Sequence, residues 1–592
     1  MMATEIIMDN AREKLKRAWR VLLFASCTLL PAACSFGEEF EAADCDEDGA
    51  GDVSYVSLDI VPTAGPDSRA GDPTGGEDGD CREPGQDYEN EVTTVTAFVM
   101  AGDAGINAQG TTPIEAVIQF YSLTQQDDAS ATYSRAYRTE TLPVAIPDGT
   151  YSVLAVANGG DMAWATNAAN LTLADVRDHI YKGYKGAAWQ ESAGEYGQFV
   201  MASADDAKLT LSSNSADEPA MAEIGVERLA ARVDYQKQGS YTCAEGAVFR
   251  GTVEIEGAVL VNNMTAGSYL FKRTADDAKG TVNLCYLGRE TAPDGVATNY
   301  VIDPWTARKT PNMGALPGEL YGLRLDTFAT SKEWAAVIGR GTPVTDVVSG
   351  KEWLRIGYTL ENTADRTAEP RDYATGVVFR ARFTPDEDAI KGSYTARHTF
   401  FRWNGALYAT CRDIMEAYWR AGSVDGAERD VKACTTWDDL RAVANGLQAG
   451  DPTGYVSWLR ACVDGHSNDG NVLTDAEQYT WTAYMQTVCG YRLDEQGKVQ
   501  IDVGGKNTRE LLARHNVQTY RDATCYYTYW IRHGGSESSD ATMKHAVVRN
   551  NIYKLSVDGV YDLGDDLPGE TPLVVTVYVN NWTLLPEESL PM

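Results

Sequence analysis

Histidine is scarce in this 592-residue chain, and so is positive charge. None of the 6 histidines lies in an HExxH arrangement, and the sequence lacks a GxSxG turn, a phosphate-binding loop and a CxxC pair. The 85 Asp and Glu residues outnumber the 51 Lys and Arg residues, giving a net charge of −34. So acidic a surface, without a basic patch, repels nucleic acid. The sequence predicts a protein that is not an enzyme, holds no metal or cofactor and has no nucleic-acid partner.

Two other possibilities stay open on composition alone. Acidic residues are abundant enough for a glycosidase pair, but no region gathers acid among aromatic residues as a sugar cleft would. Four tryptophans could serve as a carbohydrate platform, but we interpret them as core and hairpin packing. They are Trp305, Trp403, Trp437 and Trp530.

A long, unbroken apolar run is also missing. The best candidate, residues 18–33, is interrupted by polar residues and follows a basic stretch at 11–20, which is typical of a signal peptide rather than a membrane span. The sequence Leu-Pro-Ala-Ala-Cys at 30–34 resembles a relaxed bacterial lipoprotein signal. We therefore predict a signal peptide over 1–33 and lipidation of Cys34. Cys27 is the rival lipid site, and a plain secretory signal is the alternative.

Linkers rich in acid, glycine and proline flank the first predicted strand. Residues 35–41 resemble the acidic surface-export signal of Bacteroidetes lipoproteins. Residues 44–49 match the start of an EF-hand loop, but Tyr55 stands where the twelfth position needs Glu, so we expect a solvated linker. A second linker spans 65–85. Neither linker can bury enough apolar surface to fold alone.

Residues 53–61 predict a strand, because β-branched and aromatic residues alternate there with one clearly apolar face. The turn-rich segment after it carries a lone arginine, Arg69, before Ala70. Such a loop is exposed enough for a protease to separate the strand from its fold. Arg82, before Glu-Pro, is the competing site. The simpler interpretation is an ordinary first strand and then a linker.

Short apolar runs and recurrent turn signals predict a mainly β protein of two or more domains. We expect a first, predominantly antiparallel sandwich and then a second β-domain. The strands expected for the first lie at 91–100, 116–123, 131–142, 151–157, 199–203 and 207–211. Those of the second lie at 224–235, 253–261, 268–272, 356–363, 376–383, 526–533, 546–557 and 573–579.

The period shifts between residues 410 and 516, where four helix starts predict a helical insertion in the second β-domain. These starts are at Thr410, Thr436, Thr474 and Asn507, and Thr172 opens a similar capping box in the first domain. Five cysteines in or just after the insertion could pair in an exported protein, with a connectivity that the sequence does not fix. They are Cys411, Cys434, Cys462, Cys489 and Cys525.

The closing strand, 573–579, is apolar on both faces. Leu573 and Val577 share one face with two further valines, and Val574 and Tyr578 share the other. Because both faces are apolar, we expect this strand to be buried within a sandwich. The tail after it, through Leu584 to Met592, would then be free to reach a neighbour.

Several blocks, in order, resemble the major fimbrial subunits of Bacteroidales, the FimA/Mfa-type fimbrillins, and most closely the longer Mfa type. With the lipoprotein signal they cover most of the chain and are weakest at 410–516. The blocks are residues 226–233, 358–362, 374–379 and 548–555, and the closing strand that ends at Trp582.

The resemblance implies two transthyretin-like β-sandwiches in series, over residues 70–221 and 222–592. It implies a propeptide over 34–69 that is anchored in the outer membrane through the lipid on Cys34. An arginine-specific protease would cut between Arg69 and Ala70, removing the first strand. The C-terminal donor strand of another copy would then fill the groove by donor-strand exchange, building a cell-surface fimbrium that supports adhesion.

The expected partners are therefore other copies of the chain, accessory fimbrial subunits and the protease. The alternatives are an accessory tip adhesin or an anchor subunit of the same fimbria, and less favoured, a surface glycan-binding lipoprotein. An anchor would be expected to keep its first strand, and a tip subunit to lack a free donor end. A candidate cut site together with a strand-like C-terminus favours a polymerising stalk subunit.

Overall fold

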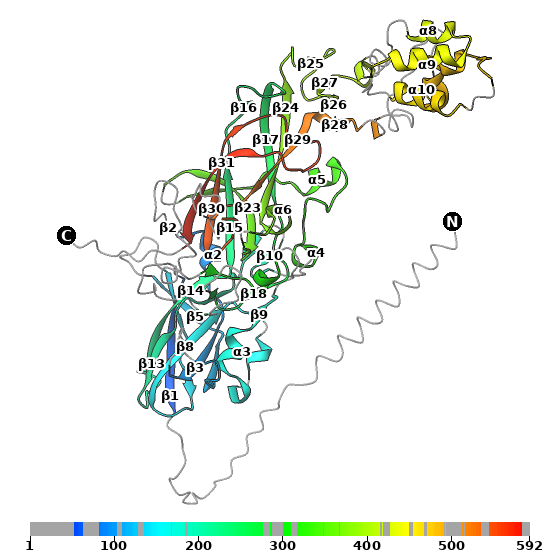
Figure 1. Ribbon diagram of the computed structural model, residues 1–592. Coiled ribbons are helices and arrows are strands. Elements are labelled where there is room, and N and C mark those ends of the chain that lie inside the picture. The colour runs from blue at the N-terminus through cyan, green and yellow to red at the C-terminus, as the bar shows by residue number, and fades with distance from the viewer. Residues whose placement is uncertain are drawn as a thin grey trace, which may run out of the picture. The chain divides into compact units, whose positions relative to one another are not determined.

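The protein is mainly β with a minority of helices, as Figure 1 shows for a computed structural model. None of the helices in the part of the chain that the structure describes is long and apolar enough to cross a membrane. The described residues are 53–62, 82–102, 109–127, 135–160, 162–166, 168–183, 187–192, 195–275, 285–286, 300–309, 317–346, 349–365, 367–414, 417, 427–448, 454–466, 470–490, 492, 512–513, 516–533 and 544–582.

A ten-stranded sheet, here the N-terminal sheet, contains β1 (Ser54–Pro62) and most strands up to residue 228. Its order is β4-β3-β8-β12-β14-β1-β6-β5, with β13 paired to β8 and β7 to β1. Every pairing is antiparallel except that of β1 with β14. The other strands are β3 (Val95–Ala101), β4 (Ala116–Phe120), β5 (Leu123–Asp127), β6 (Arg135–Thr139), β7 (Leu142–Val144), β8 (Gly149–Ala157), β12 (Met201–Ser203), β13 (Ala207–Leu211) and β14 (Ala220–Arg228).

Two cores lie on opposite faces of this sheet because side chains alternate along a strand. In β8, Val153 and Ala155 belong to one cluster, and Leu154 and Val156 belong to the other. The expected end of the first domain at residue 221 falls inside β14, whose pairing with β12 continues to Arg228. The sheet therefore extends past that boundary.

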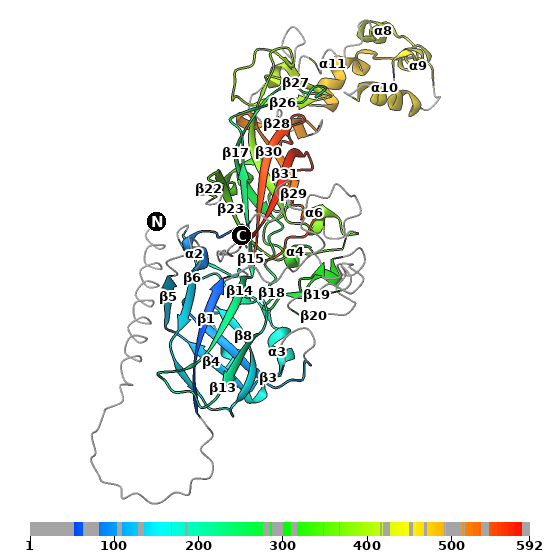
Figure 2. The same cartoon turned by 90° about the vertical axis from the view of Figure 1, so that its left-hand side faces the viewer.

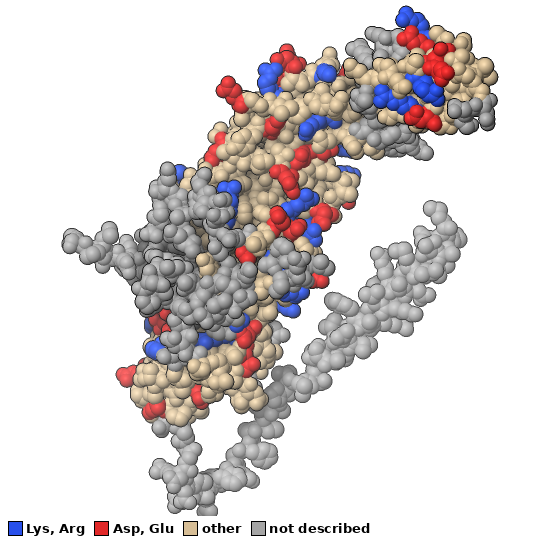
Figure 3. Space-filling model, viewed as in Figure 1, with Lys and Arg blue, Asp and Glu red and all other residues tan. Residues whose placement is uncertain are grey.

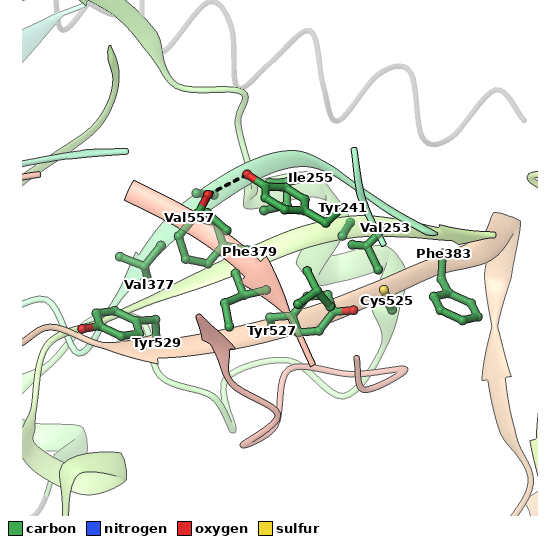
Figure 4. Close-up of a cluster of buried hydrophobic side chains, with 14 of the residues drawn as sticks. Tyr241, Val253, Ile255, Val377, Phe379, Phe383, Cys525, Tyr527, Tyr529 and Val557 are labelled. Carbon is green, nitrogen blue, oxygen red and sulfur yellow. Dashed lines mark hydrogen bonds between the residues drawn. The ribbon is translucent and has the colours of Figure 1, made fainter. Parts of the chain in front are cut away.

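Two further sheets pack face to face around a hydrophobic cluster, part of which Figure 4 shows. The first, here the C-terminal sheet, has the order β2-β31-β30-β15-β23-β22, and the second has the order β16-β17-β24-β29. Their strands are β2 (Arg82–Glu83), β15 (Ala230–Gln236), β22 (Thr342–Thr345), β23 (Glu352–Leu360), β30 (Asn551–Val560), β31 (Leu573–Trp582), β16 (Tyr241–Thr242), β17 (Gly251–Val261), β24 (Gly376–Pro385) and β29 (Thr524–Trp530).

A bulge in β17 depends on glycine. The register between β17 and β24 shifts between Ile255 and Gly257. A Cβ atom at Gly257 would lie 2.1 Å from the carbonyl oxygen of Gly339, which accepts a 2.9 Å hydrogen bond from the backbone N–H of Ala258. Any side chain there would break this contact.

Helices occupy much of residues 427–489 and share a core with a small sheet of order β25-β27-β26-β28. They are α8 (Ala427–Ala433), α9 (Trp437–Gly446), α10 (Tyr455–Asp464), α11 (Trp481–Ala483) and the π-helical turn η5 (Tyr484–Val488). The small sheet comprises β25 (Ile390–Lys391), β26 (Phe400–Trp403), β27 (Ala406–Tyr408) and β28 (Gln518–Tyr520).

The predicted helix starts fare differently. Thr436 caps α9 and Thr172 caps α3 (Leu173–Arg177), each with a complete capping box, so both predictions are confirmed. Thr410 makes the same reciprocal contacts with Asp413. The prediction that Thr474 caps a helix is wrong, because the next helical turn, the 3-10 turn η4 (Glu477–Tyr479), begins after Ala476 and has no side-chain cap. Thr480 caps α11 instead. Asn507 lies outside the described residues.

The remaining elements are short, and several of them, such as α2, α4 and β18, are labelled in Figures 1 and 2. They are α2 (Asp87–Asn90), η1 (Ala163–Ala165), η2 (Ala168–Asn170), β9 (Ile180–Tyr181), β10 (Gln190–Ser192), β11 (Glu195–Gly197), β18 (Ser268–Tyr269), β19 (Arg273–Ala275), β20 (Cys285–Tyr286), β21 (Tyr300–Val301), η3 (Thr306–Arg308), α4 (Pro317–Leu320), α5 (Ser331–Val337), α6 (Pro370–Tyr373) and η6 (Arg521–Ala523).

The predicted cysteine and tryptophan roles can be compared with the structure. Four of the five cysteines considered above, Cys411, Cys434, Cys462 and Cys525, carry free thiols, as does the buried Cys243. Trp403 is buried in the core of the helical region, and Trp530 packs beside the cluster around Trp334. Trp437 is half-buried and stacks on His466 with 3.7 Å between ring centroids.

Candidate functional site

The first strand, β1, lies inside the N-terminal sheet with neighbours on both edges (Figure 2). It runs parallel to β14 through seven residue pairs, from Val56–Ala220 to Pro62–Val226. Its other edge pairs with β7 near its start and with β6 near its end. The strand expected at 53–61 is therefore present, and it is a central strand of the sheet.

Side chains hold β1 in this register. The hydroxyl of Ser57 donates to the carbonyl of Thr139, and the backbone N–H of Leu58 donates to the Thr139 hydroxyl, each at 2.9 Å. On the solvent side, Arg138 donates two 2.8 Å hydrogen bonds to the carboxylate of Asp59. This pair raises the pKa of Arg138, chiefly through the hydrogen bond to Asp59. These contacts fix the pairing of β1 along its length.

The apolar face of β1 contributes to the core of the N-terminal sheet. Val56, Leu58 and Ile60 are fully buried, and they pack in one cluster with Ile224 and Val226 of β14. Burying a large apolar side chain contributes about 1.5–3 kcal/mol. Loss of β1 would thus remove three such side chains and one edge of backbone pairing from β14.

The lipid and cleavage residues lie beyond the part of the chain that the structure describes. Cys34 belongs to residues 1–52, and Arg69 and Ala70 belong to residues 63–81. The rival cleavage residue, Arg82, is the first residue of β2 and pairs in register with Asn581 of β31. The linker expected over 65–85 therefore overshoots, because residues 82 and 83 belong to the C-terminal sheet.

A buried ionic cluster, here the Arg232 cluster, links the segment that contains Glu83 and Glu89 to the C-terminal sheet. The Arg232 guanidinium contacts Glu83 at 2.5 Å, Glu89 at 3.0 Å and Asp234 at 2.9 Å, and all four side chains are excluded from solvent. Lys554 of β30 contacts Glu83 at 2.5 Å. Charges this deeply buried are stable only when paired and hydrogen-bonded.

Burial and pairing shift two pKa values at this cluster. Burial raises the pKa of Asp234 to about 6 despite its contact with Arg232. Burial also acts to raise the pKa of Asp346. The hydrogen bonds that Asp346 accepts from Lys554 and Ser349 outweigh the effect of burial and lower its pKa to about 2. Sequence reasoning missed the cluster, because its acidic members on the 82–90 segment look like parts of a solvated linker.

The closing strand, β31, differs from the prediction. It pairs with β30 through nine residue pairs, but among the described residues its other edge meets only β2, at Asn581 and Trp582. Leu573 is buried, whereas Val574 to Val579 are half-buried or, at Thr576, exposed. The expectation of a strand buried on both faces is wrong, because only the face of Leu573 and Val577 packs on the core. The tail at 583–592 lies outside the described residues.

No catalytic or metal site stands out beside these strands. Across the described ranges, no group of three or more His, Cys, Asp or Glu side chains is placed to hold a metal ion. On the face shown in Figure 3, basic and acidic residues are interspersed over the described surface. The strand β1, the Arg232 cluster and β31 make up the candidate site, because they combine paired strands with the contacts that hold those strands in place.

A family model matches the end of the chain. Residues 518–588 match the model described as major fimbrial subunit protein type IV, fimbrillin, C-terminal, a stretch that includes β28 to β31. The match defines the class of protein as a fimbrial subunit of the cell surface. It confirms the predicted resemblance to the fimbrillins over these residues at the end of the chain.

Several solved structures are distantly similar. A protein named for cell adhesion from Parabacteroides distasonis is 11% identical with a TM-score of 0.39, covering 90% of this chain and 100% of that one. The C-terminally truncated tip fimbrial protein Mfa3 from Porphyromonas gingivalis is 9% identical with a TM-score of 0.28, covering 90% and 100%. A fimbrial assembly protein from Parabacteroides distasonis is 13% identical with a TM-score of 0.22, covering 56% and 99%. No curated protein matches the chain.

Proposed function

We propose that this fimbrillin is a polymerising stalk subunit that joins other copies of itself by donor-strand exchange and supports adhesion. The observation that carries the proposal is the position of β1, which is paired on both edges and fully buried at Val56, Leu58 and Ile60. Removing such a strand leaves unpaired backbone groups and an apolar slot. An extended segment of another subunit satisfies both.

The cut that releases β1 lies between Arg69 and Ala70 and is made by an arginine-specific protease. Between Pro62, where β1 ends, and Arg82, where β2 begins, Arg69 is the only arginine. The alternative, Arg82, would require β2 to leave β31 before cleavage, because proteases bind an extended, unpaired backbone.

Two variants test the cut by N-terminal sequencing of surface-sheared material. Arg69→Ala is expected to leave a full-length precursor that forms no fibre. Arg82→Ala is the matched control and is expected to be processed and to polymerise like the parent chain. Fibres built from Arg69→Ala, or a processed chain that begins at Glu83, would contradict this cut site.

The donor is the C-terminal tail beyond β31, whose leucines fill the slot vacated by β1. Deleting residues 584–592 is expected to leave a folded, processed monomer that cannot extend a fibre. Normal assembly of the truncated chain would exclude the tail as donor. A truncated chain that fails to fold would instead place the tail in the core of its own subunit.

Before cleavage the precursor is held at the outer membrane by a lipid on Cys34, and accessory fimbrial subunits complete the fimbrium. Labelling with a fatty-acid analogue is expected to be lost in Cys34→Ala and kept in Cys27→Ala. If labelling is instead kept in Cys34→Ala and lost in Cys27→Ala, the lipidated residue is Cys27.

The architecture is two transthyretin-like sandwiches in series, joined where β14 passes into β15, with the helical region of 410–516 inserted in the second. The separate cores on either side of this junction support that division. Limited proteolysis is expected to trim the helical region first and leave both sandwiches intact. Simultaneous loss of the second sandwich would argue against an insertion.

A further inference from the structure

A second buried polar cluster, here the Lys309 cluster, brings an amine, an amide and a carboxyl group together away from solvent. Lys309, Asp303 and Asn362 are 0%, 2% and 1% exposed. Lys309 is the C-cap of η3 and Asp303 precedes this turn, whereas Asn362 lies just after β23. The fold therefore brings together Lys309 and Asn362, which are 53 positions apart in sequence.

The amine of Lys309 lies against the side-chain amide of Asn362. Its Nζ atom is 2.6 Å from the amide oxygen Oδ1. Since a carbonyl bond is about 1.2 Å long, Nζ lies at most about 3.8 Å from the amide carbon. This is close to the separation of about 3–3.5 Å at which groups react within a site.

The amide itself is held in one orientation. Its Nδ2 atom donates to the carbonyl of Tyr373 at 2.9 Å and to the hydroxyl of Thr375 at 2.8 Å. The hydroxyl of Tyr321 lies 3.2 Å from Oδ1 and 2.8 Å from the Tyr373 carbonyl, so its single hydrogen can serve either oxygen. Burial raises the pKa of Tyr321, and the hydroxyl therefore keeps that hydrogen.

A proton acceptor contacts the same amine. Lys309 donates to the carboxylate of Asp303 and, at 3.0 Å, to the carbonyl of Thr363. Asp303 is fixed in turn by the backbone N–H groups of Trp305, at 2.7 Å, and Thr363, at 2.6 Å. Burial lowers the pKa of Lys309, which favours the neutral, nucleophilic amine.

We propose that Lys309 and Asn362 form an intramolecular isopeptide bond, with Asp303 moving the proton. Asp303 takes a proton from the Lys309 ammonium, and the neutral amine attacks the Asn362 amide carbon. The carbon–nitrogen bond to Nδ2 breaks as the new bond to Nζ forms. Asp303 returns its proton to the leaving Nδ2 group and then passes on the surplus proton of Nζ, so the nitrogen leaves as ammonium, which is one ammonia and one proton. One ammonia is released, and neither an oxidant nor a reductant is needed.

The bond would tie η3 to the end of β23 within a single subunit. It is independent of strand exchange, since none of its atoms belongs to β1, β2 or β31. A test for this bond should therefore give the same result on the precursor and on the processed chain.

The test is mass spectrometry of the full-length chain, purified, denatured and digested with trypsin. We expect a chain lighter by one ammonia, and one branched peptide in which residues 309–324 are joined to residues 356–366. Lys272 is the internal control: it is equally buried and lies 2.7 Å from a Glu227 carboxylate oxygen rather than an amide, so it should stay unlinked.

Two separate peptides at their full sequence masses would overturn the proposal. So would loss of ammonia confined to the 356–366 peptide, since Asn362 would then have closed on its own backbone. The parent chain alone decides these outcomes, whether or not any variant folds.

Variants assign the roles. Lys309→Arg keeps the charge but removes the nucleophile, and Asp303→Asn keeps the shape but removes the proton acceptor, so both are expected to lose the branched peptide. Folding of each variant is checked by circular dichroism. A branched peptide that persists in folded Asp303→Asn would remove Asp303 from the mechanism.

Discussion

The strands β1 and β31 stand near opposite ends of the described chain and are built from similar apolar alternation, yet the fold uses them differently. β1, of 9 residues, is central and paired on both edges. β31, of 10 residues, is half-buried and has β2 alone on its outer edge among the described residues. A central strand leaves a slot when it is removed, whereas an edge strand can be continued by the segment after it. In the proposed donor-strand exchange, the end that contains β1 is the one that would accept a strand, and the end after β31 is the one that would offer it.

The largest effect should come from placing a charge in each strand in turn. Leu58→Asp buries a carboxylate at a fully enclosed position and is expected to destabilise the unprocessed chain by more than about 4 kcal/mol. Val577→Asp, on the half-buried strand, is expected to cost about 1–2 kcal/mol. Soluble yield and the urea midpoint measure both. Equal losses would mean that the two strands are equally enclosed.

The next effect concerns the Arg232 cluster, which links the segment after the proposed cut to the sheet that contains β31. Arg232→Ala leaves Glu83, Glu89 and Asp234 buried without their shared cation and is expected to cost about 3–5 kcal/mol. The exposed Arg250 is the control, and Arg250→Ala should not change the urea midpoint measurably. If Arg232→Ala behaves like that control, the segment is not fastened through this cluster.

A smaller, pH-dependent effect is expected beside β30, the inner neighbour of β31. Burial lowers the pKa of His533 to about 4, and its ring lies 2.8 Å from the Tyr553 hydroxyl. Between pH 6.5 and 4 the unfolded chain therefore binds the extra proton, so stability falls as the pH falls, by at most about 3 kcal/mol. His533→Gln should flatten the pH dependence of the thermal midpoint in this window. Replacement of the exposed His398 by Gln controls for histidine loss, and an unchanged slope in His533→Gln would refute the assignment.

The smallest effect is expected on the solvent side of β1. Arg138→Ala removes the ion pair with Asp59, which is partly exposed and is expected to contribute only about 0.2–1 kcal/mol. A loss larger than that of Leu58→Ala would show that the ion pair, rather than the apolar face, holds β1 in place. Thermal unfolding of both variants in parallel makes this comparison.

The sequence by itself determined the local elements, because alternation and capping are properties of neighbouring residues. The span of β1, the capping boxes at Thr172 and Thr436 and the fimbrillin resemblance of the chain's last strands could all be predicted from it. Only the tertiary structure decided which apolar faces are covered, since the pattern of β31 predicts burial on both faces but the strand is packed on one. Only the fold pairs β1 in parallel with β14, some 160 residues later, and only the fold brings Lys309 to Asn362. Such contacts depend on partners distant in sequence, and no local pattern specifies them.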